Sequence, residues 1–238
     1  MICFLTSRVD DTETGKLFSA NRFADELRKH FPKPCRALDI CSDPDDWEAM
    51  DFYSALTKKQ FEDAGFAFER FDTLDNRNQE LSARLVGQSN LIILAGGHVP
   101  TQHRFFENIR LRELLRDFCG VIIGISAGSM NSAKVVYSQP EKEGEAVDSS
   151  YQRFFPGLGL TGTNLLPHYQ AVKDDVLDGL RVFEDIACPD SMGKTFYAIP
   201  DGSYLFTDGR REELRGEAYT VKDGVITRIS SCGDIVLL

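Results

Sequence analysis

The first half of the chain alternates short apolar runs with longer amphipathic stretches. Five runs have the length of strands, and they lie at residues 2–6, 36–41, 66–71, 91–94 and 121–125. The stretches between them carry apolar residues near helical spacing, which predicts helices at 17–27, 46–56, 75–85 and 101–118. The runs LIIL and VIIG are apolar without alternation, as in strands covered on both faces. This order predicts an α/β fold with a doubly wound, mostly parallel sheet and helices on both faces.

The pattern changes after about residue 135. Residues 138–163 are rich in Gly, Pro, Ser and Glu and predict a long loop, and residues 172–187 predict a helix. From Lys194 onward the chain reads as strands separated by Asp-Gly pairs, which favour hairpin turns and predict C-terminal antiparallel strands. Neither a repeat nor a domain boundary interrupts the pattern, so we expect one domain over residues 1–238.

Composition narrows the classes of protein. The 238 residues are 42% hydrophobic, with 17 Phe, which excludes a disordered chain. The net charge is −10, and residues 39–75 hold eleven acidic against three basic side chains, which argues against a nucleic-acid partner. No apolar run reaches the roughly 18 residues of a membrane span. The acidic N-terminal segment lacks the basic region of a signal peptide, so we expect a cytoplasmic protein. The six cysteines are scattered without the spacing of a zinc site, so we expect no metal.

One segment carries the pattern of a nucleophile. A buried strand runs into Gly124-Ile-Ser126-Ala127-Gly128, and a helix is expected to follow. Gly-x-Ser-x-Gly in this context is typical of a nucleophile elbow, in which the sharp turn projects the serine above the sheet edge. The glycines remove the β-carbons that would collide in that turn.

A serine hydroxyl needs a base, and the base needs an acid to orient it. His168 is the only histidine after Ser126, and it follows an apolar run and Pro167, at the edge of the sheet where ligands bind in open α/β folds. Spacing leaves the acid open. The candidates are Glu141, Glu143, Glu145, Asp148 and Asp201.

Two backbone N–H groups are needed to hold an oxyanion. Ala127, the residue after the nucleophile, supplies one candidate. The pair Gly96-Gly97, at the end of the strand at 91–94, supplies the other, because glycines let the backbone approach a bound carbonyl closely.

Four elements, in this chain order, resemble peptidase E (aspartyl dipeptidase) and its relative cyanophycinase. They are the Gly96-Gly97 turn with Thr101-Gln102, the elbow at 124–128, Pro167-His168, and Pro200-Asp201-Gly202, which together span roughly residues 88–208. The resemblance implies a fold similar to class I glutamine amidotransferases, with serine in place of the amidotransferase cysteine. It also implies a serine peptidase that cleaves small peptides with an acidic residue on the acyl side and uses neither metal nor cofactor.

Carried over to this chain, the resemblance makes Ser126 the nucleophile, His168 the general base, and Gly97 and Ala127 the oxyanion donors. It leaves Asp201 and Glu141 as near-equal candidates for the acid. Two departures stand out. His98 follows the glycines where the family usually has Asn, and the segment after His168 offers only Lys173 and Arg181 as cations for an acidic substrate. The aspartyl preference is therefore not supported by the sequence.

Two other functions fit part of the pattern. An α/β-hydrolase esterase would use Ser126, Asp148 and His168 in that chain order, although a separation of forty-two positions from serine to histidine is short for that fold. An amidotransferase-like domain without catalysis would bind a small molecule or a protein partner with the same fold. A small peptide is the expected partner of the peptidase, and a homodimer is compatible with an open sheet.

Overall fold

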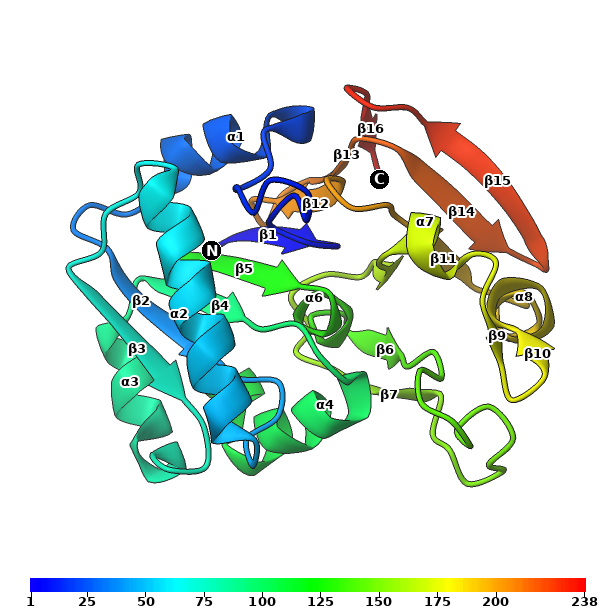
Figure 1. The fold of residues 1–238 in the computed structure, drawn as a ribbon, viewed down its shortest axis with the longest axis horizontal. Helices are drawn as coiled ribbons and strands as arrows, with labels where there is room; N and C mark the ends of the chain where they lie inside the picture. The colour runs from blue at the N-terminus through cyan, green and yellow to red at the C-terminus, as the bar shows by residue number, and fades with distance from the viewer.

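The computed structural model describes residues 1–238 and is built on an eight-stranded sheet (Figure 1). Across this sheet the strands are β16 (Ile235–Leu237), β13 (Glu212–Arg215), β12 (Tyr204–Thr207), β1 (Ile2–Thr6), β5 (Val121–Ile125), β4 (Leu91–Leu94), β2 (Arg36–Ile40) and β3 (Arg70–Leu74). The five neighbouring strands β1, β5, β4, β2 and β3 are parallel, and β12, β13 and β16 extend the sheet in antiparallel pairing. The predicted mostly parallel α/β fold with C-terminal antiparallel strands is confirmed.

Helices cover both faces of the parallel strands. One face packs on α1 (Phe23–His30) and α2 (Trp47–Asp63), and the other on α3 (Ser82–Gln88), α4 (Val99–Asn108) and α5 (Leu111–Leu114). Apolar and polar residues do not alternate in β4 because both of its faces are buried. Leu91 and Ile93 pack in the core under α1 and α2, and Ile92 and Leu94 pack in the core under α3 to α5. None of the helices has the length and apolar character needed to cross a membrane.

A smaller four-stranded sheet stands beside the main one (Figure 1). Its order is β15 (Val225–Ser230), β14 (Ala218–Lys222), β11 (Thr195–Ala198) and β8 (Asn164–Leu166). The remaining elements are short: η1 (Ala20–Arg22), η2 (Gln79–Leu81), α6 (Ala127–Asn131), β6 (Val135–Tyr137), β7 (Phe154–Pro156), α7 (Tyr169–Val172), β9 (Val176–Leu177), β10 (Leu180–Arg181), η3 (Val182–Ala187) and α8 (Cys188–Asp190).

Several predicted elements differ from the structure. The helix expected at 172–187 is wrong: β9 and β10 form a hairpin around Asp178-Gly179, and only the π-helix η3 follows. Both turn residues have positive φ, which an Asp-Gly pair accepts and a helix does not. The helix expected at 101–118 breaks at Arg110, which has φ 54°. The predicted loop at 138–163 contains β7, which pairs with β6.

The Asp-Gly pairs near the C-terminus have two different roles. Asp208-Gly209 joins β12 to β13 and Asp223-Gly224 joins β14 to β15, as hairpins. Asp201-Gly202 does not close a hairpin, because β11 before it belongs to the small sheet and β12 after it belongs to the large one. This turn therefore carries the chain from one sheet to the other.

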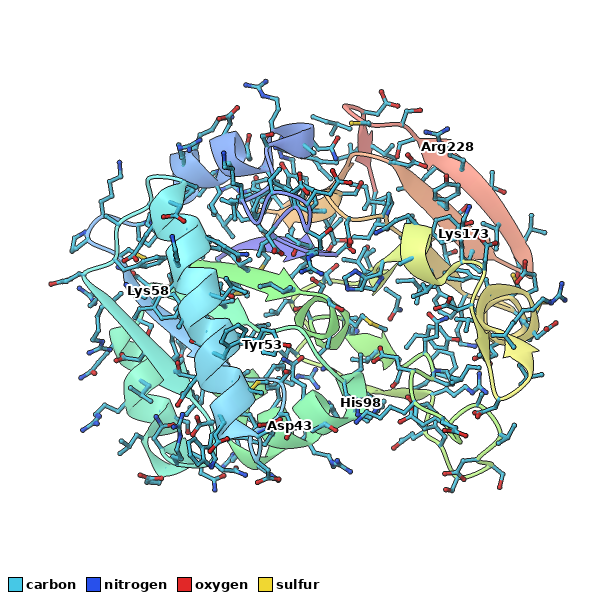
Figure 2. The ribbon with its side chains drawn as sticks, in the orientation of Figure 1. Asp43, Tyr53, Lys58, His98, Lys173 and Arg228 are labelled. Atoms are coloured by element: carbon cyan, nitrogen blue, oxygen red, sulfur yellow. The ribbon has the colours of Figure 1, made fainter.

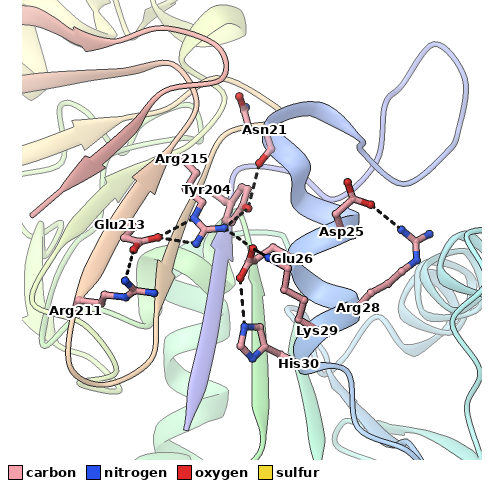
Figure 3. Close-up of polar contacts among 10 residues, drawn as sticks. All are labelled: Asn21, Asp25, Glu26, Arg28, Lys29, His30, Tyr204, Arg211, Glu213 and Arg215. Atoms are coloured by element: carbon pink, nitrogen blue, oxygen red, sulfur yellow. Dashed lines mark hydrogen bonds and ion pairs between the residues drawn. The ribbon is translucent and has the colours of Figure 1, made fainter.

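A buried ion-pair cluster ties the antiparallel extension to α1 (Figure 3). The guanidinium of Arg215 contacts Glu26 on α1 at 3.0 Å and Glu213 on its own strand at 2.6 Å. It also lies 4.7 Å from the ring centroid of Phe206. Burial disfavours ionised Glu26, but the bonds from Lys29 and Arg215 outweigh it and lower the pKa of Glu26 to about 2.

Candidate active site

The sharp turn between β5 and α6 presents Ser126. Its backbone has φ 48° and ψ −109°, a conformation that costs an L-residue energy and that the surroundings must impose. The Ser126 N–H donates to the carbonyl of Thr6 at 3.0 Å, and its own carbonyl accepts from the N–H groups of Ser129 and Met130 at 2.9 and 3.0 Å. These bonds fix the turn between β1, β5 and α6.

The two glycines of the motif are required by close packing. A β-carbon on Gly124 would lie 2.9 Å from the backbone nitrogen of Ser129. A β-carbon on Gly128 would lie 2.2 Å from the carbonyl oxygen of Leu94 on β4. Glycine at both positions lets α6 sit directly on the strands that hold Ser126.

A continuous chain of hydrogen bonds starts at the Ser126 hydroxyl. His168 follows β8 in a left-handed conformation, with φ 59°. Its Nε2 lies 3.0 Å from Ser126 Oγ, and its Nδ1 lies 2.8 Å from Asp201 Oδ1. The Asp201-Gly202 turn between the two sheets thus delivers a carboxylate to the far side of the imidazole.

Ser7, which no sequence motif marks as functional, completes this arrangement. Its hydroxyl donates to Asp201 Oδ1 at 2.6 Å and accepts from the backbone N–H of His168 at 2.8 Å. Burial disfavours ionised Asp201, but the bonds from His168 and Ser7 outweigh it and lower the Asp201 pKa. A signal was present, because Ser7 directly follows the first predicted strand and the carboxyl ends of parallel strands meet at one edge.

The other candidate acids lie elsewhere. No hydrogen bond joins Glu141 to His168; the Glu141 N–H donates to Glu145 Oε2 at 2.9 Å. Glu145 also pairs with His98, whose Nε2 lies 2.8 Å from Glu145 Oε1 and whose Nδ1 lies 2.8 Å from the Thr101 hydroxyl. His98, at the start of α4 (Figure 2), therefore anchors the loop that carries Glu141. Asp148 accepts from the N–H and hydroxyl of Ser150 within that loop, and no hydrogen bond joins it to His168.

The candidate oxyanion donors are available. No backbone carbonyl accepts from the N–H of Gly97 or of Ala127, the first residue of α6. Gly97 approaches Ser42 so closely that a β-carbon would lie 2.3 Å from its hydroxyl oxygen. Gly96, Gly97 and Ser126 line one cavity.

Ser126 and His168 lie between two cavities. The first, of about 390 Å³, lies under α2 and reaches the carboxyl ends of β1, β2 and β4. The second, of about 350 Å³, is lined by Glu141, Asp175 and several apolar side chains. The first cavity contains one Arg or Lys side chain, Arg8, which is paired with Asp10 at 2.8 Å, and the second contains none.

Neither Lys173 nor Arg181 lines these cavities, and Arg181 pairs with Asp185 at 2.8 Å. Lys173 lies just past α7 (Figure 2). No three His, Cys, Asp or Glu side chains come together in a cluster suited to a metal ion.

The sequence model of Peptidase family S51 matches residues 43–215, which is most of the chain and includes Ser126, His168 and Asp201. The chain belongs to peptidase family S51. Family membership makes the protein a serine peptidase, as the resemblance to peptidase E implied. No curated protein sequence matches this S51 protein significantly.

Two solved structures share the fold of this S51 protein. A peptidase from an acI-B1 actinobacterium has a TM-score of 0.66 at 16% identity, and the match covers 100% of this chain and 96% of that one. A protein assigned to peptidase E from Listeria monocytogenes EGD-e has a TM-score of 0.62 at 16% identity, covering 96% and 98% of the two chains. The peptidase E-type fold is therefore shared over almost the whole chain.

Proposed function

We propose that this S51 protein hydrolyses small peptides through a Ser126–His168–Asp201 triad. The observation that carries the proposal is the unbroken chain of contacts from Ser126 Oγ through the imidazole to Asp201, at 3.0 and 2.8 Å. The same geometry favours Asp201 over Glu141 as the acid, since Asp201 alone of the two is bonded to His168.

In the proposed mechanism, His168 Nε2 removes the Ser126 proton as Oγ attacks the peptide carbonyl carbon. Asp201 holds the Nδ1–H tautomer and stabilises the imidazolium that forms. The N–H groups of Gly97 and Ala127 hold the oxyanion. His168 then gives the proton to the leaving amine, and an acyl-enzyme remains. Water, deprotonated by His168, attacks the acyl carbon and releases Ser126.

The size and charge of the two cavities limit the substrate. Cavities of about 390 and 350 Å³ on either side of Ser126 match the acyl and leaving portions of a short peptide. The only Arg or Lys side chain that lines either cavity, Arg8, is already paired with Asp10, so we do not extend an aspartyl preference to this chain.

The test is amine release from a panel of dipeptides and tripeptides, including Asp-X and Glu-X, by the wild type and by Ser126→Ala. We expect turnover that falls by several orders of magnitude in the variant while its circular dichroism spectrum stays unchanged. Asp201→Asn and Glu141→Gln, measured side by side, test the acid: the first should lose most of the rate and the second should keep it. Near-normal turnover by Ser126→Ala would refute the assignment.

A further inference from the structure

The first cavity contains a carboxylate that the proposed mechanism does not use. Asp39 is the fourth residue of β2, and its side chain faces the cavity under α2. The residue is 5% exposed, and its Oδ1 has no hydrogen-bond partner. A buried carboxylate oxygen without a partner is costly, because its lost hydration is not replaced.

The groups around Asp39 do not neutralise it. Ser54 on α2 shares a 2.8 Å hydrogen bond with Thr73, the neighbour of Asp39 on β3, and its bond to Asp39 lowers the Asp39 pKa without supplying a charge. The one cation that lines the cavity, Arg8, bonds to Asp10 through Nε, and Gln60 on α2 bonds to the other Asp10 oxygen at 2.9 Å. Because the opposite charges of Arg8 and Asp10 cancel, Asp39 gives the cavity a net negative charge.

We propose that this cavity is a subsite for a cationic side chain on the acyl side of the scissile bond, and that Asp39 is its counter-ion. The proposal rests on the peptidase function above, because Asp39 and Ser126 line one cavity and would contact one substrate. An incoming ammonium would bond to the Asp39 carboxylate in a charge-assisted contact and supply the counter-charge that no side chain around the cavity provides.

The sheet register decides which ammonium can reach Asp39. Asp39 is opposite Ile93 on β4, and Ile93 is opposite Ile123 on β5, three residues before Ser126. Two strand spacings across and three residues along place the Cα atoms of Asp39 and Ser126 roughly 14 Å apart. The α-ammonium of the acyl residue is two bonds from the reacting carbonyl carbon, whereas a lysine side-chain ammonium is six bonds away. The register therefore favours the side chain.

The cavity has room for such a side chain. Its walls include apolar side chains that suit a methylene chain, among them Val9 and Met50. Tyr53 lies on α2 (Figure 2), lines the cavity and is 57% exposed. An aliphatic stem with a charged end matches an apolar cavity that contains one unpaired carboxylate.

Binding to Ser126→Ala protein, measured by calorimetry at neutral pH, tests the proposal without requiring turnover. The probes are lysylalanine and norleucylalanine, which differ in the side-chain ammonium. We expect lysylalanine to bind at least tenfold more tightly, and the preference to disappear when Asp39→Asn is added. Asp117→Asn is the matched control, because it removes an equal charge from an exposed carboxylate with no ion pair in the loop before β5. It should leave the preference intact.

A second variant guards against misfolding of Asp39→Asn. Thr57→Lys places an ammonium at a half-buried cavity position on α2 and should also abolish the preference. Equal binding of the two probes, no binding of either, or a preference that survives Asp39→Asn would overturn the proposal. An Asp39-dependent preference for alanylalanine over its N-acetyl form would overturn the side-chain assignment.

The binding result also separates this inference from the peptidase function. Peptide turnover by the wild type without a lysyl preference would leave the peptidase function standing and refute the subsite. An Asp39-dependent lysyl preference in binding, without turnover of any peptide by the wild type, would support the subsite and refute the peptidase function.

Discussion

Asp39 gives a sharp prediction about stability. Burial raises its pKa to about 6, and Ser54 offsets only part of that effect. Because the folded-state pKa is above the unfolded value, folding favours the protonated form. The protein therefore loses stability as the pH rises from below 3.8 through 6, and the full loss is present at neutral pH. A shift of this size corresponds to about 3 kcal/mol.

Replacing Asp39 by Asn removes this pH-dependent loss of stability. We expect the free energy of unfolding of the variant, minus that of the wild type, to increase by about 2–3 kcal/mol when the pH is raised from about 3.5 to 7.5. Because the comparison is between two pH values, contributions of the amide that do not depend on pH cancel.

The assay is urea unfolding followed by circular dichroism, with linear extrapolation at each pH. Asp117→Asn, whose carboxylate is exposed, should show almost no change over the same range. A pH-independent difference for Asp39→Asn would refute the reasoning, because it would mean that the carboxylate is solvated or hydrogen-bonded in the folded state.

Three further predictions follow from the geometry. Ser7→Ala removes the bond that aligns Asp201 with the His168 backbone, so kcat should fall roughly tenfold with KM unchanged in steady-state kinetics; an unchanged kcat would contradict this role. Ser126→Gly should be about 1 kcal/mol more stable than Ser126→Ala in thermal unfolding, because glycine accepts the strained φ while both variants lack the hydroxyl; equal stability would argue against strain. Arg215→Met removes the cation that Glu26 and Glu213 share and leaves them paired only with Lys29 and Arg211, so it should cost about 2–3 kcal/mol in urea unfolding; a loss below about 1 kcal/mol would show that those two cations suffice.

Four of the five parallel strands were predictable because their signals were strong and local, whereas β3 (Arg70–Leu74) begins four residues after the start of the predicted run at 66–71. The run 91–94 is apolar at every position, and the structure buries it on both faces. The Gly-x-Ser-x-Gly motif was equally informative, because both glycines face contacts that exclude a β-carbon. In these segments the residue types that burial requires are the same ones that the backbone geometry requires.

Other features depend on contacts between distant segments. The amphipathic pattern at 172–187 fits a helix, but Asp178-Gly179 favours a turn, and the turn prevails. The acid could not be chosen by spacing, because Asp201 reaches His168 only through the crossing between the sheets. In the sequence, Asp39 is marked only as an acidic residue inside an apolar strand. Its role depends on which helix covers that face of β2.

The turn at Asp201-Gly202 also bears on how the protein folds. The bond between Ser7 and Asp201 joins residues 194 apart in sequence, and the bond between Ser7 and His168 joins residues 161 apart. Contacts of such high order close late, since the chain entropy of a long loop must be overcome before they form. Both sheets must be in place before His168 is oriented. Recovery of catalytic activity should therefore lag behind the return of secondary structure during refolding.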